Sequence, residues 1–156
     1  MPAWRKILCP IDFSEHSRLA MLEAAAITRR VGAQLFLLHV LEERRPVSRA
    51  DVLAPPEFLA RLSEGAQRDL AAWKSVAEEL APGRVITEMV GGHPATEILR
   101  VAREGDFDLV VIGTHGRRGL RRFVIGSVAA EVARSASCSV EVVRSKARGE
   151  FEVAPD

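Results

Sequence analysis

Residues 113–132, GTHGRRGLRRFVIGSVAAEV, hold the part of this chain best suited to bind an anion. Gly113 and Gly116 follow an apolar run, and a residue without a side chain lets backbone amides approach a ligand closely. Gly126 and Ser127 come after nine further residues, where a helix is expected to begin. Unpaired amides and the positive end of a helix dipole favour an anion there, and the serine hydroxyl adds a donor. We call these two groups of donors the corners at Gly113–Gly116 and at Gly126–Ser127. Together they predict a site for one polyphosphate.

The spacing of these residues differs from both common phosphate fingerprints. G-x-x-x-x-G-K-[ST] requires a lysine where the chain has Gly126, and G-x-G-x-x-G requires closer glycines after the first strand. Four arginines lie between the corners, and they are either a solvated basic face or the countercharge that a lysine would supply: Arg117, Arg118, Arg121 and Arg122. The sequence therefore predicts nucleotide binding without a Walker lysine.

Each of these residues also has a purely structural interpretation. Glycines at a strand-to-helix junction are commonly turn residues, and Ser127 can serve as the N-cap of the helix while its hydroxyl still points outward. A valine in place of Gly126 should fill the space of a phosphate and resist any positive φ that the turn requires. Asp12 is a common turn residue, and at the end of a strand it is also a suitable acceptor for a ribose or a base.

Composition limits the class of protein. A chain of 156 residues that is 47% hydrophobic corresponds to one domain, and 22 basic against 21 acidic residues give a net charge of +1, which argues against nucleic-acid or membrane binding. No leader-like or membrane-spanning stretch is evident, so a cytoplasmic location is expected. Cys9 and Cys138 lack disulfide or zinc spacing and are expected to be small buried residues. The four histidines show no paired metal spacing, so we expect no dedicated metal site.

Short apolar runs alternate with longer amphipathic ones, as in parallel sheets with crossover helices. Strands are expected at 6–11, 35–41, 84–90, 109–112 and 140–143, and helices after Ser14, at 57–80, from Pro94 to Gly105 and at 127–135. In the first helix we expect Ser14 as the N-cap, a buried stripe of Leu19, Leu22 and Ala26, and Gly32 with positive φ at the end. Residues 42–56 are expected to form a mobile surface loop that covers a nucleoside.

Five strands and four helices in alternation predict a single doubly wound α/β domain. In such sheets ligands lie outside the carboxyl ends of the strands, near the point where strand order reverses. The run 109–112 is apolar throughout, which places it inside the sheet. The strand ends expected to lie nearest a ligand are Ile11-Asp12, Val40-Leu41 and the residues from Gly113 onward.

Gly113-x-x-Gly116, nine residues and then Gly126-Ser127 resemble the G-2x-G-9x-G-[ST] signature of the ATP-binding branch of the universal stress protein family. The resemblance extends to PIDFS at 10–14, VGGHP at 90–94 and CSVEVVR at 138–144. It implies a Rossmann-like, adenine nucleotide alpha hydrolase-like sheet with strand order 3-2-1-4-5, a family domain at 1–145 and a tail at 146–156. It also implies ATP, with Mg²⁺ carried by the nucleotide, at the following positions: Pro10, Ile11, Asp12, Val40, Gly113, Thr114, His115, Gly116, Arg117, Gly126, Ser127 and Val128.

The resemblance implies a homodimer that pairs through the last strand, and an unidentified regulatory partner. Ser139 and Glu141 stand where the family usually has a proline and an aliphatic residue, so the pairing strand departs from the pattern. The sequence contains few candidate catalytic residues, because no nucleophile elbow or catalytic triad is recognisable in it. If His115 oriented a water near Asp12, slow hydrolysis would follow.

The leading hypothesis is an ATP-binding regulator of the stress response with at most slow ATPase or autophosphorylation activity. The alternative is a nucleotide-independent dimeric scaffold of the same fold. A phosphoacceptor receiver domain is disfavoured, because it would need an aspartate where Val90 and Gly91 stand and an acidic neighbour for Asp12.

Overall fold

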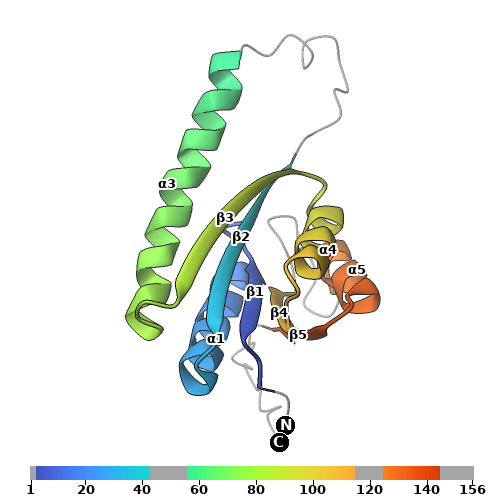
Figure 1. The fold of residues 1–156 in the computed structure, drawn as a ribbon. Coiled ribbons are helices and arrows are strands. Elements are labelled where there is room, and N and C mark those ends of the chain that lie inside the picture. The colour runs from blue at the N-terminus through green and yellow to red at the C-terminus, as the bar shows by residue number, and fades with distance from the viewer. Residues whose placement is uncertain (1–2, 43–55, 115–124, 145–156) are drawn as a thin grey trace, which may run out of the picture.

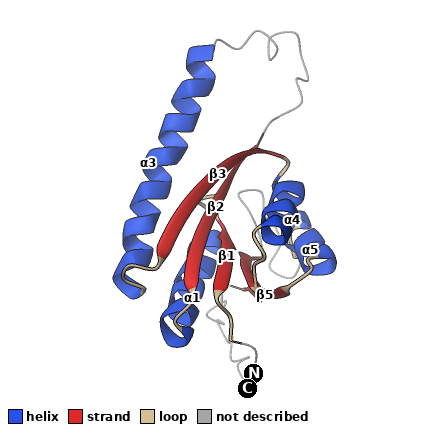
Figure 2. Ribbon diagram, viewed as in Figure 1, coloured by secondary structure: helices blue, strands red, loops and turns tan. Residues whose placement is uncertain are grey.

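The computed structural model describes residues 3–42, 56–114 and 125–144, which form one five-stranded parallel sheet with helices on both faces (Figures 1 and 2). The order across the sheet is β3-β2-β1-β4-β5, which confirms the expected doubly wound topology. The elements in chain order are β1 Lys6–Pro10, α1 Glu15–Val31, β2 Gln34–Glu42, α3 Pro56–Leu80, β3 Val85–Gly92, α4 Pro94–Glu104, β4 Leu109–Gly113, α5 Ser127–Ser135 and β5 Ser139–Val143.

The predicted elements agree with these bounds to within two residues. All five residues of β4 are buried, as expected for an apolar strand inside a parallel sheet. Strand β1 lies between β2 and β4, with Ile7 in register with Leu35 on one side and with Leu109 on the other. The reversal of strand order therefore falls between β1 and β4.

Two hydrophobic clusters stabilise the sheet, one on each face. The first joins α1 and α3 to the sheet around Ile7, Leu35 and Leu37, and the second joins α4 and α5 around Leu8, Leu38 and Val110. Cys9 is fully buried in the first cluster, and this burial raises the pKa of its thiol far above the ordinary value. Cys138 is only partly buried, so the expectation of a buried residue was wrong for it; both cysteines are free thiols.

Helix α1 begins and ends as its sequence predicts. The Ser14 hydroxyl accepts a hydrogen bond from the backbone N–H of Ser17, and Gly32 takes the left-handed conformation with φ 73°. The predicted buried stripe was wrong, because Leu19 and Leu22 are only half-buried and Ala26 is exposed. The buried face consists instead of small residues and two larger apolar ones: Ser17, Ala20, Met21, Ala24, Ala25, Ile27 and Thr28. Small side chains let the helix approach the sheet closely, so alanines rather than leucines occupy the contact face.

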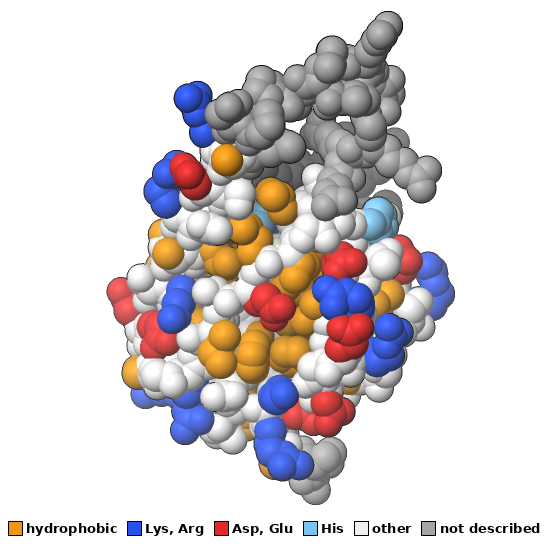
Figure 3. All heavy atoms as spheres, turned by 45° about the horizontal axis from the view of Figure 1, so that its top comes forward, with side chains coloured by type: hydrophobic (Ala, Val, Ile, Leu, Met, Phe, Trp, Pro, Cys, Tyr) orange, Lys and Arg blue, Asp and Glu red, His pale blue; other side chains and the backbone are white. Residues whose placement is uncertain are grey.

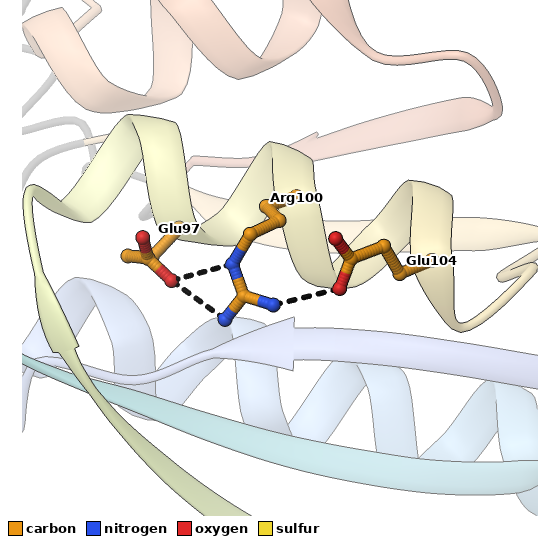
Figure 4. A network of polar contacts seen from close by, with 3 residues as sticks. All are labelled: Glu97, Arg100 and Glu104. Atoms are coloured by element: carbon orange, nitrogen blue, oxygen red, sulfur yellow. Dashed lines mark hydrogen bonds and ion pairs between the residues drawn. The ribbon is translucent and has the colours of Figure 1, made fainter.

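Helix α4 has Pro94 in its first turn, as expected, and His93 is its N-cap residue. Gly105 follows the last residue of α4. Its φ is −82°, which is not left-handed, so the backbone conformation does not require a glycine here. A Cβ at Gly105 would collide with the ring of Phe107, and close packing therefore explains the glycine. On the solvent side, Arg100 pairs with both Glu97 and Glu104 at 2.7 Å (Figure 4).

The surface carries interspersed charges of both signs. In the view of Figure 3, acidic and basic side chains surround an apolar area, in keeping with the near-zero net charge. None of the described helices is long and apolar enough to cross a lipid bilayer. Most of the predicted loop at 42–56 and all of the tail at 146–156 lie outside the described residues, while Glu42 belongs to β2 and Pro56 to α3.

Candidate functional site

The candidate site lies at the carboxyl edge of the sheet, where β1 and β4 are neighbours. Parallel strands all end at the same edge, so the residues that follow β1, β2 and β4 are brought to one side of the molecule. Pro10 and Ile11 are buried, and the Ile11 N–H donates to the Leu38 carbonyl at 2.7 Å. This bond extends the β1–β2 pairing by one residue and holds the start of the next turn.

Asp12 lies in a tight turn between β1 and α1. Its Oδ1 accepts from the Ser14 N–H at 3.0 Å, and its own N–H donates to the Ser17 hydroxyl at 3.3 Å. The turn is therefore held by the same serines that begin α1. A carboxylate has about four acceptor positions, so Asp12 is chemically suited to accept from a ligand hydroxyl or amine.

Gly113 ends β4 against the first turn of α1. A Cβ built on it would lie 2.6 Å from the His16 carbonyl oxygen and 2.7 Å from the carbonyl carbon, distances that a real Cβ does not show. Glycine at this position is therefore required by the packing of α1 on β4. This structural requirement is separate from the predicted approach of a ligand to its backbone.

Thr114 joins three elements at the end of β4. Its N–H donates to the Val143 carbonyl at 3.1 Å, and its carbonyl accepts from the Gly126 N–H at 2.5 Å. Its hydroxyl lies 3.4 Å from Nδ1 of His16 in α1. Although eleven residues separate Thr114 from Gly126, the hydrogen bond places Gly126 next to the residue that follows Gly113.

Helix α5 begins at the second corner. Gly126 is the N-cap residue, and its carbonyl accepts from Ala130 N–H at 2.9 Å. Ser127 is therefore the first helical residue and not the N-cap, so that structural interpretation was wrong. Since no side chain caps this helix among the described residues, its first amides can donate to an anion.

Ser127 and Val128 differ in exposure. Ser127 is exposed at the helix start, while Val128 is half-buried against the cluster of α4 and α5. Gly126 has φ −59° and ψ 154°, an extended conformation open to any residue, so the expected need for positive φ does not apply. A hydroxyl donor and helix amides thus converge near Thr114.

Val40 lies close to the end of β2, in register with Val90 of β3. Its side chain is half-buried against the cluster that contains Leu8 and Leu38, on the side of α4. Because the side chain is used in packing, any contact of Val40 with a nucleoside would involve its backbone.

Part of the predicted site lies outside the described residues. His115, Gly116 and Arg117 are in this group, together with Arg118, Arg121 and Arg122. Among the residues that the structure describes, no group of three or more His, Cys, Asp or Glu side chains could hold a metal ion.

Two carboxyl groups elsewhere in the described chain have clearly shifted pKa values. The backbone N–H groups of Arg5 and Lys6 donate to Asp108 at 2.8 and 2.9 Å, which lowers the pKa of this carboxyl at the opposite edge of the sheet. Burial raises the pKa of Glu141 on β5, and Glu23 adds to the increase. Polar contacts and helix amides characterise the candidate site.

Two further residues at this edge were not predicted from the sequence. His16 touches both Gly113 and Thr114, and the rule that α1 begins next to β4 at the reversal point could have indicated it. Phe13 follows Asp12 and has φ 63°, in the left-handed region. No sequence pattern predicts this conformation for an aromatic residue.

The topology and the clustered strand ends define a Rossmann-like α/β protein with its candidate ligand site at the β1–β4 reversal. Comparison with known proteins then specifies the family. The model of the universal stress protein family matches residues 3–144, and the chain belongs to this family.

Individual relatives agree with this assignment. Universal stress protein MJ0531 of Methanocaldococcus jannaschii is 34% identical over 142 residues, which cover 90% of this chain and 82% of the relative. The structure of universal stress protein UspA from Lactobacillus plantarum superposes with a TM-score of 0.83 at 26% identity, covering 92% of this chain and all of that chain. A universal stress protein solved in complex with cAMP has a TM-score of 0.70 at 21% identity over 91% of this chain and 98% of its own, and it shows a shared fold.

Proposed function

We propose that this protein binds ATP at the β1–β4 edge and acts as a nucleotide-dependent regulator of the stress response. The observation that supports the proposal is the hydrogen bond from Gly126 N–H to the Thr114 carbonyl, since it brings the start of α5 next to the residue that follows Gly113. A polyphosphate next to this bond would meet the first amides of α5 and the exposed Ser127 hydroxyl. Any hydrolysis or autophosphorylation is expected to be slow.

The nucleoside is assigned to the other side of the edge. Asp12 would accept from a ribose or base, and the backbone of Val40 would contact the base from the end of β2. The cAMP complex of a related protein supports this arrangement only in that the shared fold accommodates an adenine nucleotide. His115, Gly116 and Arg117 are proposed as further contacts.

Mg²⁺ is proposed to arrive with the nucleotide phosphates. The described residues include no cluster of metal ligands, so the phosphate oxygens would supply most of its coordination. The chemistry of Mg²⁺ here would be to neutralise phosphate charge.

Mass spectrometry of ligand released from the untagged, purified protein tests the proposal. An adenine nucleotide released on denaturation, and ATP binding in a calorimetric titration of the emptied protein, are expected. Absence of both would contradict it and would favour the alternative function.

The alternative is a nucleotide-independent dimeric scaffold, and the position of β5 at an edge of the sheet favours it. Such a strand presents unpaired backbone groups that a second copy can use. Glu141 places a partly buried carboxyl on this strand. Homodimerisation through β5, a regulatory protein partner, a cytoplasmic location and the division into a domain at 1–145 and a tail at 146–156 all remain predictions.

A further inference from the structure

Phe13 adopts a backbone conformation that is unusual for its residue type. Its φ is 63°, and the described residues contain one other non-glycine residue with positive φ, Asp106 at 52°. The left-handed region brings Cβ close to the following carbonyl, and bulky residues avoid it unless surrounding contacts hold them there. The position of Phe13, directly after Asp12, is where such strain is expected to matter for function.

Two aromatic contacts hold the Phe13 ring. Its centroid lies 4.6 Å from that of His39 on β2 and 5.4 Å from that of Trp73 on α3, where the rings meet edge to face at 83°. Edge-to-face and tilted pairs at these distances are favourable. All three side chains are half-buried, so the contacts also exclude part of the solvent.

His39 is itself fixed to the same turn. Its Nδ1 lies 2.7 Å from the carbonyl oxygen of Ile11, and because a carbonyl only accepts, this nitrogen donates the hydrogen. The bond orients the imidazole ring that lies against Phe13. The turn at Asp12 is therefore clamped from β2 through His39 and from α3 through Trp73.

The conformation of Phe13 decides where the Asp12 carboxylate lies. The chain passes from Asp12 through Phe13 to Ser14, and the Asp12 carboxylate accepts from the Ser14 N–H. If Phe13 adopted another backbone conformation, the direction of the chain from Asp12 to Ser14 would change. The hydrogen bond from the Ser14 N–H to the Asp12 carboxylate could then not keep its geometry. The Asp12 carboxylate would then leave the position in which it accepts from Ser14.

We infer that Phe13 is a positioning residue, whose ring, held by His39 and Trp73, keeps Asp12 in the conformation that binds the nucleoside. The inference rests on the proposed function and adds a determinant of affinity outside the glycine motif. It also links the site to α3, because Trp73 of α3 contacts Phe13.

Calorimetric titration of ATP against a double-mutant cycle tests this inference. ATP is the probe because its phosphates keep affinity measurable when Asp12 is replaced. Phe13→Ala removes the ring, and the left-handed conformation is still unfavourable for alanine, so ATP affinity should fall about tenfold. Phe13→Gly removes the ring but adopts the left-handed region freely, so affinity should fall only about threefold. In an Asp12→Ala background, Phe13→Ala should change affinity by less than about twofold, because coupled residues are non-additive.

Phe36→Ala is the matched control. Phe36 also meets an aromatic partner edge to face, Phe107 at 4.9 Å, but in the opposite hydrophobic cluster. It should lower the melting temperature and leave ATP affinity unchanged. Circular dichroism shows that each variant is folded.

Three outcomes would overturn the inference. Wild-type protein that binds no ATP would refute the proposed function together with it. Wild-type binding that Phe13→Ala leaves unchanged would refute the positioning role alone. An equal loss from Phe13→Ala with and without Asp12 would mean that Phe13 acts on affinity without Asp12, which also refutes it.

Discussion

Replacing Gly113 with alanine should destabilise the fold and weaken the site together. The added Cβ would lie 2.6 Å from the His16 carbonyl oxygen, well inside an ordinary van der Waals contact, and neither backbone atom can move away alone. Overpacking of this kind costs about 1–3 kcal/mol of unfolding free energy. For a chain of this length that corresponds to a decrease in melting temperature of roughly 2–12 °C. Urea unfolding and thermal unfolding followed by circular dichroism measure both quantities.

Gly32→Ala is the matched control for Gly113→Ala. Gly32 has φ 73°, and a Cβ added to it would meet no atom within 4 Å, so its substitution costs about 1 kcal/mol through backbone strain alone. ATP affinity should fall in Gly113→Ala, because α1 is pushed away from Thr114, and should be unchanged in Gly32→Ala. A Gly113→Ala protein as stable as wild type would refute the close-packing argument.

Three further substitutions test other parts of the structure. Ser127→Ala should lower ATP affinity about ten- to a hundredfold, leave AMP affinity nearly unchanged and leave stability unchanged, since Ser127 is exposed and is not the cap; equal losses for both nucleotides in calorimetry would contradict it. Asp108→Asn should destabilise at neutral pH, because backbone donors lower the pKa of Asp108 in the folded state. The stabilisation is present above the ordinary carboxyl pKa and is lost as pH falls through the lowered one, so urea unfolding should show the two proteins converging in acid. Glu141→Gln should stabilise at neutral pH, because a raised pKa in the folded state means that ionisation opposes folding as pH rises through it; a gain that persists unchanged in acid would count against this.

Local patterns in the sequence were sufficient to predict where most helices and strands begin and end. Helix α5 runs from Ser127 to Ser135 as predicted, because a glycine and a serine precede its apolar pattern and small polar residues follow it. The buried run of β4 was also confirmed. The contact face of α1 was not predictable from its leucines, because close approach of the helix to Gly113 selects Ala20 and Ala24.

The candidate site was only partly predictable for a related reason. A motif identifies residues near one another in sequence, such as Gly126 and Ser127, whereas tertiary contacts decide which other side chains join them. His16 and Phe13 are placed by the packing of α1 on β4 and by the rings of His39 and Trp73. Gly105 illustrates the same point, since its φ of −82° does not require a glycine and close packing against the Phe107 ring explains the residue instead.

Titration of ATP against wild-type protein and Gly126→Val tests the central claim most directly. Gly126 has φ −59° and ψ 154°, which a valine can adopt, so the variant should fold and the added side chain should act mainly by filling phosphate space. We expect calorimetry to detect ATP binding to wild type and none to Gly126→Val, with circular dichroism showing the same helix content for both. Equal ATP affinity in the two folded proteins would mean that the glycines serve only as turn residues, and it would contradict nucleotide binding at this edge.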